Sequence, residues 1–224
     1  MADRQQTAIA IFAKAPIAGF AKTRLIPRLG APGAARFQHQ MIEKTLHTAQ
    51  AAAIGPVSLW CTPSVHEPAF QALAEHNGVS LCTQPNTDLG QRMAHAFAAI
   101  TPELPILLVG TDCPALTAHH FVLCARALKN GADAVFIPVE DGGYILIGLK
   151  RSVPALFQDM AWGSAQVMAA TRARARALGL KWLEMPPLWD IDVEEDYDRA
   201  LALGLIAPDA DAHASVSEQG GMVS

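Results

Sequence analysis

The sequence is short of the features that mark metal-cluster, membrane-spanning and secreted proteins. Its 224 residues include only four cysteines, and none of them form the Cys-x-x-Cys pairs typical of zinc and iron–sulfur sites. No apolar run approaches the roughly 20 residues that span a bilayer, and the polar residues 1–6 lack the apolar segment of a signal peptide. We therefore expect a cytoplasmic protein with no membrane span and with reduced thiols.

Positive charge is also scarce. The chain has 17 Lys and Arg against 21 Asp and Glu, a net charge of -4. A surface that coats nucleic acid needs a basic stripe, so we expect no nucleic-acid partner and only a small anionic ligand. Four of the basic residues nevertheless fall within fifteen positions: Lys14, Lys22, Arg24 and Arg28. This local positive patch predicts an anion-binding segment.

Short apolar segments alternate with segments of helical periodicity along most of the chain. The predicted strands are 7–13, 57–61, 79–82, 104–109, 132–139, 144–149 and 181–185. The predicted helices are 31–53, 66–77, 89–100, 117–129, 164–178 and 193–205. This alternation predicts an α/β fold with three layers, α/β/α, around a mainly parallel sheet. We expect a single domain over residues 1–207, followed by a polar tail over 208–224.

The basic patch lies in a loop, residues 13–25 (AKAPIAGFAKTRL), that directly follows the first predicted strand. Pro16 and Gly19 bend the backbone, and outward-facing amides in such a bend can bind an anion. Lys22 and Arg24 would add charge-assisted hydrogen bonds to phosphate oxygens. The loop therefore predicts a phosphorylated ligand; the alternative is a surface loop with solvated lysines.

The loop is not a Walker A motif. That motif requires one glycine directly before the lysine and a second glycine five positions earlier. Here Ala21 precedes Lys22-Thr23, and Pro16 stands at the upstream position. Phosphate binding by this loop must use another geometry.

Three aspartates are candidates for a metal site. In open α/β sheets, ligands bind beyond the carboxyl ends of the strands, and Asp112 directly follows the predicted central strand 104–109. A carboxylate there can hold a hard divalent cation, whose remaining ligands are waters and substrate phosphates. Asp190 and Asp192 alternate along an extended segment, so only one of them can readily share that cation. The alternative for Asp112 and Asp192 is a turn or helix cap.

Two further motifs are candidates for a functional role. Residues 141–144 (Asp-Gly-Gly-Tyr) predict a close backbone approach to a ligand, because glycine removes side-chain bulk, or else a plain tight hairpin. Cys113 beside Asp112 raises the possibility of a thiol-dependent hydrolase. No histidine is placed by sequence to activate the thiol, which makes this the weakest of the functional hypotheses.

Four segments in order carry a family resemblance: KAPIAGFAKTRL (14–25), LLVGTDCPALT (107–117), DGGYILIGL (141–149) and WDIDVEEDYDRAL (189–201). Together they resemble the bacterial GT-A-fold glycosyltransferase-like family, of the selenodomain-associated transferase type. That family is related to molybdenum cofactor guanylyltransferase and phospholactate guanylyltransferase. The resemblance spans about residues 7 to 205.

The resemblance implies a nucleotide-diphospho-sugar transferase fold, which is GT-A-like and Rossmann-like. It implies that Lys22 and Asp112 are catalytic, that Asp112 and Asp192 hold Mg²⁺ or Mn²⁺, and that residues 141–144 contact substrate. The implied substrate-binding residues are Asp141, Gly142, Gly143 and Tyr144. The implied nucleotide-binding residues are Ala13, Lys14, Gly19, Lys22, Thr23, Arg24 and Asp112.

The implied activity is a metal-dependent transferase that uses a nucleotide or nucleotide-sugar and a small-molecule acceptor. Glycosyl transfer from an NDP-sugar is the first reading. Two departures bear on it: Asp-Cys-Pro (112–114) replaces the glycosyltransferase Asp-x-Asp, and residues 192–196 (DVEED) lack the usual proline. The alternatives are a nucleotidyltransferase that releases pyrophosphate from an NTP and a nucleotide-binding protein without turnover.

Overall fold

The structure is a computed structural model that describes residues 6–100 and 104–208. Its strands are β1 Ala8–Lys14, β2 Val57–Thr62, β3 Ser80–Thr83, β4 Ile106–Val109, β5 Ala134–Pro138, β6 Tyr144–Leu149 and β7 Trp182–Glu184. Its α-helices are α1 Ile26–Ala51, α2 Pro68–Asn77, α3 Leu89–Ala99, α4 Ala118–Lys129, α5 Val167–Ala177 and α6 Glu194–Ala202. Two short 3-10 helices are η1 Thr23–Leu25 and η2 Pro154–Leu156. The predicted tail lies outside these residues from 209 onward.

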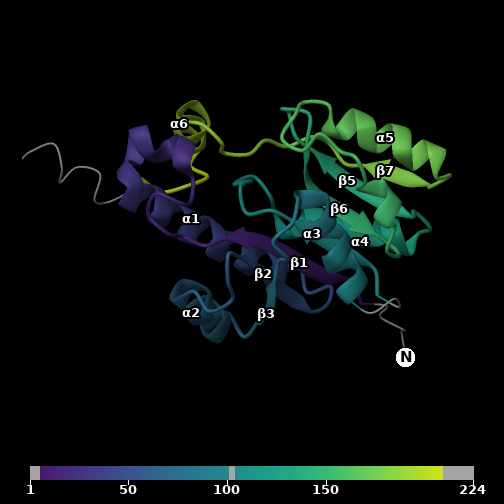
Figure 1. The fold of residues 1–224 in the computed structure, drawn as a ribbon, viewed down its shortest axis with the longest axis horizontal. Helices are drawn as coiled ribbons and strands as arrows, with labels where there is room; N and C mark the ends of the chain where they lie inside the picture. Colours follow the sequence, from purple (N-terminus) through teal and green to yellow (C-terminus); the bar gives the residue numbers. More distant parts are fainter. Residues whose placement is uncertain (1–5, 101–103, 209–224) are drawn as a thin grey trace, which may run out of the picture.

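The strands form one sheet in the order β3-β2-β1-β4-β6-β5-β7. All neighbouring pairs are parallel except those of β6, which runs antiparallel to both β4 and β5. Figure 1 labels β3, β2, β1, β6, β5 and β7, which follow one another across the molecule in this order. The predicted mainly parallel sheet is confirmed, and β4, the most hydrophobic segment, is its central strand and is buried throughout.

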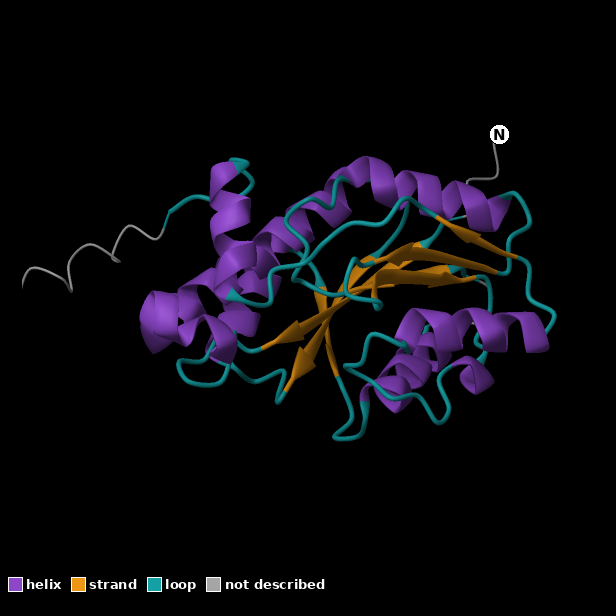
Figure 2. Ribbon diagram, turned by 90° about the horizontal axis from the view of Figure 1, so that it is seen from above, coloured by secondary structure: helices purple, strands orange, loops and turns teal. Residues whose placement is uncertain are grey.

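Helices cover both faces of the sheet, as Figure 2 shows from above. One core packs α1, α2 and α4 against the sheet, with large side chains such as Ile42, Phe70 and Phe121. The other core packs α3, η2 and α5 against the opposite face, with Phe97 and Phe157 stacked on each other. The three-layer α/β/α architecture predicted from the sequence is confirmed.

The local signals that set helix ends are borne out. Asp88 caps α3 by accepting a hydrogen bond from the Gln91 amide at 2.9 Å, and Gly78 ends α2 with a left-handed φ of 63°, as glycine at this position allows. The helix α1 begins at Ile26, five residues before the predicted start at 31, and continues through a kink at Gly30. Local pattern gives no reason for this extension.

The reason is a third apolar cluster at one end of the molecule. Leu25, at the end of η1, and Leu29, in the first turns of α1, belong to this cluster. They pack with Trp189 and Ile191, which precede α6, and with Tyr197 in α6. Figure 1 shows α6 beside the start of α1. This cluster ties the loop after β1 to the segment around residue 190, and it therefore brings two distant parts of the sequence to the same place.

Gly148 lies in β6 where that strand passes between β4 and β5. A Cβ at this position would come within 2.5 Å of Leu107 Cδ2 and 2.6 Å of Val135 Cγ1. Both of these side chains are fully buried, so neither can move away freely. The close packing of β6 against β4 and β5 therefore requires glycine, which has no side chain, at this position.

Replacing Gly148 by alanine is therefore expected to lower the free energy of unfolding by about 1–3 kcal/mol, the usual cost of overpacking a core. Urea denaturation measures this. Gly110→Ala is the matched control, because an added Cβ there meets no atom within 4 Å, and its stability is expected to be unchanged or slightly raised. Equal stability losses in the two variants would contradict the packing explanation.

Candidate functional site

The carboxyl ends of the parallel strands meet at one edge of the sheet and form a cleft of about 340 Å³. Lys14 ends β1, Thr62 ends β2, Gln84 follows β3, and Gly110 follows β4. This is the position at which open α/β sheets bind ligands. The cleft is lined by Phe12, Ala13, Lys14, Lys22, Thr23, Arg24, Gln38, Thr62, Gln84, Leu89, Arg92, Gly110, Thr111, Asp112 and Asp192.

Lys22 reaches from the β1–α1 loop to the carboxyl end of β4. Its Nζ lies 2.6 Å from Asp112 Oδ1 and donates a hydrogen bond to the Ile191 carbonyl at 2.7 Å. The Lys22 side chain is 7% exposed, whereas that of Asp112 is 50% exposed. Lys22 also has a left-handed φ of 46°, a conformation that is uncommon for a residue other than glycine and is found at functional sites.

The same loop holds the acidic segment before α6. Arg24 forms an ion pair with Asp192, and the Ile191 amide donates to the Asp112 carbonyl at 2.9 Å. Lys22, Asp112 and Asp192 therefore face one cleft, although they are up to 170 residues apart in the sequence. Neither carboxylate serves as a helix cap here: Asp196 accepts the amide hydrogen bonds of Asp192 and Val193 before α6.

Most of the predicted nucleotide-binding loop lines the cleft, but Gly19 does not. Ala13, Lys14, Thr23 and Arg24 are lining residues, and the Lys14 ammonium lies 4.1 Å from the centre of the Phe20 ring. Gly19 shapes the bend of the loop, where its φ is 78°, and its contact with a nucleotide stays a prediction.

Sequence reasoning missed five polar residues of the cleft: Gln38, Thr62, Gln84, Arg92 and Thr111. Gln38 is buried and donates to the Lys14 carbonyl at 3.1 Å, while Gln84 donates to the Trp60 carbonyl at 2.8 Å. These buried amides fix the backbone below the cleft. Thr62 and Gln84 could have been found, because each follows a predicted parallel strand whose carboxyl end lies at this edge.

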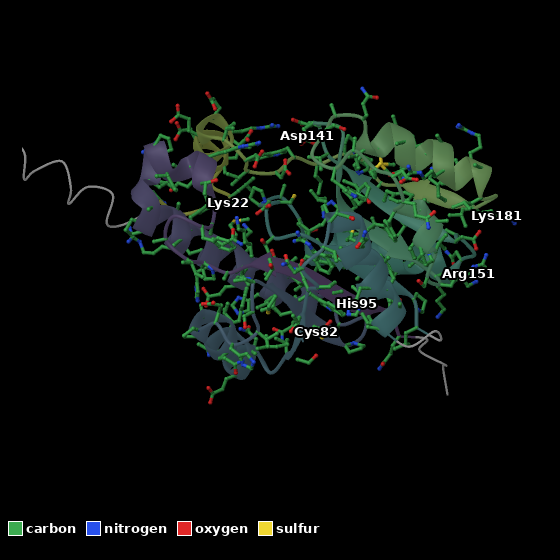
Figure 3. All side chains as sticks on the ribbon, viewed as in Figure 1. Lys22, Cys82, His95, Asp141, Arg151 and Lys181 are labelled. Carbon is green, nitrogen blue, oxygen red and sulfur yellow. The ribbon has the colours of Figure 1, made fainter. Side chains whose placement is uncertain are left out.

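Two further cavities of about 270 and 170 Å³ continue the cleft along the same edge. Asp112 lies between the first cleft and the larger cavity, and Tyr144 and Asp190 line both added cavities. Asp141 and Gly143 line the smaller one. We refer to these two cavities together as the second subsite; Lys22 and Asp141, labelled in Figure 3, mark the first cleft and the second subsite.

Gly142, the fourth residue predicted to contact substrate, lies against the loop before α5. Its φ is 96°, and a Cβ there would lie 2.2 Å from the Ala165 carbonyl oxygen. The Gly142 carbonyl also accepts a hydrogen bond from the Met168 amide at 2.8 Å. The absence of a side chain at this position therefore lets two backbone segments approach each other closely; a contact of Gly142 with substrate stays a prediction.

Negative charge is crowded at the junction of the cleft and the second subsite. Burial, together with the charges of Asp141, Asp112 and Asp192, raises the pKa of the Asp190 carboxyl to about 6. A bound cation would stabilise the charged form of a carboxyl in such surroundings.

The Cys113 thiol is in an environment that disfavours nucleophilic chemistry. Cys113 is 5% exposed, and burial raises its pKa to about 11. The thiol therefore stays protonated near neutral pH, whereas a thiolate is needed for attack. This observation argues against the thiol-dependent hydrolase hypothesis.

The residues present fit a divalent cation held jointly by protein and substrate. Asp112 and Asp192 supply the carboxylate oxygens that Mg²⁺ and Mn²⁺ prefer. Among the described residues, no group of three or more His, Cys, Asp or Glu is arranged to hold a metal by itself. Such a donor set suits a metal whose remaining ligands are phosphate oxygens and water, as is usual for Mg²⁺.

Solved structures of known proteins share the fold. A protein from Desulfovibrio desulfuricans G20, provisionally described as a nucleotide-diphospho-sugar transferase, superposes with a TM-score of 0.78 at 25% identity, covering 95% of this chain and 94% of that chain. A 4-diphosphocytidyl-2C-methyl-D-erythritol synthase from Anaerococcus prevotii DSM 20548 has a TM-score of 0.62 at 13% identity, covering 90% and 97%. A CMP:2-keto-3-deoxy-manno-octonic acid synthetase in complex with CTP has a TM-score of 0.58 at 10% identity, covering 89% and 98%.

The fold is therefore that of the nucleotide-diphospho-sugar transferases and cytidylyltransferases. Residues 45–164 match the family described as "Uncharacterized protein conserved in bacteria (DUF2064)", and the chain belongs to this family. A comparison with curated proteins found no match. Within residues 6–100 and 104–208, none of the helices combines the length and the apolar character needed to cross a bilayer.

Proposed function

We propose that the protein is a metal-dependent transferase that moves a sugar from a nucleotide-sugar donor to a small-molecule acceptor. The observation that carries this proposal is the convergence of Lys22, Asp112 and Asp192 on one cleft at the carboxyl edge of the sheet. Similarity to a described nucleotide-diphospho-sugar transferase at 25% identity over nearly the full chain supports it. The sequence motifs further favour the selenodomain-associated transferase type.

The cationic side chains of the cleft would bind the phosphates of the donor. Lys14, Lys22, Arg24 and Arg92 all line it, and charge-assisted hydrogen bonds from such groups bind phosphate strongly. Asp112 and the Ile191 carbonyl hold the Lys22 ammonium in place. Its side chain is therefore ordered before the donor binds, and binding does not have to offset the entropy of ordering it. The protein's contribution is then to position the reactants and stabilise charge.

Asp112 and Asp192 would hold Mg²⁺ or Mn²⁺. The bound cation would supply Lewis-acid stabilisation of negative charge on the leaving diphosphate. Arg24, paired with Asp192, keeps that carboxylate at the cleft, and Lys22 does the same for Asp112. The Asp112 side chain, half exposed, is accessible from solvent.

The second candidate is nucleotidyl transfer, in which an NTP reacts with an acceptor and releases pyrophosphate. Two observations favour it: Asp-Cys-Pro at 112–114 lacks the Asp-x-Asp of glycosyltransferases, and the structures with this fold include proteins described as a cytidylyltransferase and a nucleotidyl transferase. Both reactions would use the same cleft, since each requires a nucleotide phosphate beside a cation.

A thermal-shift panel of NTPs, NDPs and NDP-sugars, each with and without Mg²⁺ or Mn²⁺, tests the proposal, because a ligand of the native state raises the melting temperature. Metal-dependent stabilisation by NDP and NDP-sugar, followed by NDP release with an acceptor, would support glycosyl transfer. Stabilisation by an NTP with pyrophosphate release would support the second candidate. Binding with no product from any acceptor would indicate a non-catalytic nucleotide-binding protein, and no stabilisation by any nucleotide would overturn the proposal.

A further inference from the structure

The continuous cavity at the carboxyl edge of the sheet changes its charge from one end to the other. The first cleft is lined by Lys14, Lys22, Arg24 and Arg92 together with Asp112 and Asp192. The second subsite is lined by the carboxylates of Asp112, Asp141 and Asp190. Among the described residues, its lining includes no lysine, arginine or histidine.

The arginines close to the second subsite are engaged elsewhere. Arg199 pairs with Glu140 at 3.0 Å, with both of its terminal nitrogens on that carboxylate. Arg174 donates to the backbone carbonyls of Asp159 at 2.8 Å and Leu156 at 3.4 Å. Neither guanidinium lines the second subsite, so neither is in position to form an ion pair with an anion bound there.

The remaining surface of the second subsite is apolar and aromatic. Tyr144 and Trp162 line it together with aliphatic side chains such as Met93 and Ile145. Tyr144 is half-buried against Phe136, with ring centres 5.8 Å apart, which fixes its orientation. An aromatic wall with a few carboxylate acceptors suits a ring that has apolar faces and hydroxyl or amino groups at its edge.

We propose that the second subsite binds the non-nucleotide moiety of the substrate, and that this moiety is a neutral or cationic ring bearing hydroxyl or amino groups. Hydroxyl and ammonium groups donate hydrogen bonds, which Asp141 and Asp190 can accept. A carboxylate or phosphate in the same place would lie against the like charges of Asp141 and Asp190, which no lysine or arginine in the described lining of that subsite offsets; the Lys22 ammonium pairs with Asp112, at the border with the first cleft. This inference rests on the proposed function and narrows its substrate class to sugars or amino sugars without acidic groups.

The cavity beyond Trp162 also has no lysine or arginine among its described lining residues. It is the larger space of about 590 Å³ between α3 and the segment after η2, and Trp162 lines both it and the second subsite. Its charged lining residues are Asp88 and Asp159. An acceptor that extends past Trp162 therefore meets further acidic rather than basic groups.

Matched nucleotide-sugars test the inference by isothermal titration calorimetry in the presence of Mg²⁺ or Mn²⁺. The probes are the NDP-glucose, NDP-glucuronate and NDP-2-amino-2-deoxyglucose of the base that the nucleotide panel selects, with NDP alone as reference. We expect NDP-glucose and the amino sugar to bind at least about tenfold more tightly than the glucuronate, because a unit negative charge near the half-buried Asp190 and the exposed Asp141 is unfavourable by that order.

The variants Asp141→Asn and Asp190→Asn are expected to reduce the ratio of the NDP-glucose affinity to the NDP-glucuronate affinity at least about threefold. Each substitution removes one negative charge while conserving the shape of the side chain. Glu75→Gln, an equal charge change on an exposed position of α2, is the matched control and should leave the ratio unchanged. Binding of each nucleotide-sugar is read relative to NDP alone in the same variant, which separates the subsite from the nucleotide cleft.

Tighter or equal binding of NDP-glucuronate by the unaltered protein would overturn the inference while leaving the proposed function intact. A ratio that neither aspartate variant changes would also overturn it, because the selectivity would then come from elsewhere. Absence of metal-dependent binding of NDP itself would instead overturn the proposed function.

Discussion

Replacing Asp112 by asparagine is expected to lower metal-dependent turnover about a thousandfold and to abolish the part of nucleotide stabilisation that requires Mg²⁺ or Mn²⁺. The carboxylate is at the carboxyl end of the central strand, half exposed and directed at the same cleft as Asp192. An amide keeps the shape of the side chain but provides a poorer ligand for a hard cation. Because the cation stabilises developing charge in the transition state, its loss affects turnover more than folding.

Turnover and thermal shift, each with and without metal, measure this prediction. Cys113→Ala is the control at the neighbouring position and should keep most of the turnover, since its buried thiol is protonated near neutral pH. Full metal-dependent turnover in Asp112→Asn would remove this residue from the metal site. Loss of turnover in Cys113→Ala alone would restore the thiol-dependent hydrolase.

Replacing Lys22 by alanine is expected to weaken nucleotide binding by about 10- to 100-fold, the effect of losing a hydrogen bond from a charged group. The side chain is 7% exposed and its ammonium lies between Asp112 and the Ile191 carbonyl. Removing it takes a positive charge from the phosphate end of the cleft. It also frees Asp112 from its ion pair, so binding of Mn²⁺ without nucleotide should be unchanged or tighter.

Calorimetry with nucleotide and with Mn²⁺ alone separates these two effects. Lys181→Ala is the matched control, because its side chain is exposed at the start of β7 and remote from the cleft, as labelled in Figure 3. A parallel loss of nucleotide and Mn²⁺ binding would mean that Lys22 only holds the loop in place. Unchanged nucleotide affinity would remove the loop from the proposed function.

The secondary structure and the layers could be read from local pattern. The alternation of apolar runs with helical periodicity, the cap at Asp88 and the glycine at position 78 gave elements close to those observed. Each of these signals depends only on residues close together in the sequence, so it can be recognised without knowledge of the fold. The predicted start of α1 at residue 31 was wrong, because Leu25 and Leu29 pack in one apolar cluster with Trp189 and Tyr197, and the distant part of the sequence that supplies these partners is not visible in local pattern.

Much of the candidate site was also predicted from the position of residues relative to strand ends. The strand-end rule pointed to the basic loop with Lys22, to Asp112 and to the segment of Asp190 and Asp192, and the family resemblance implied Asp192; Lys22, Asp112 and Asp192 all line the cleft. Gln38 could not be chosen in this way. It is in the middle of α1, and only the packing of that helix brings its amide to the Lys14 carbonyl.

The sequence alone determined the alternation of strands and helices, the position of the basic loop and the placement of acidic residues after strands, because these depend on periodicity and short-range chemistry. Tertiary structure alone decided that β6 lies between β4 and β5, that Gly142 approaches the Ala165 backbone, and that the lysines and arginines of the cavity gather at one end, whereas carboxylates line both ends. Those features come from contacts between segments distant in the chain, whose pairing is selected by the burial of the whole core.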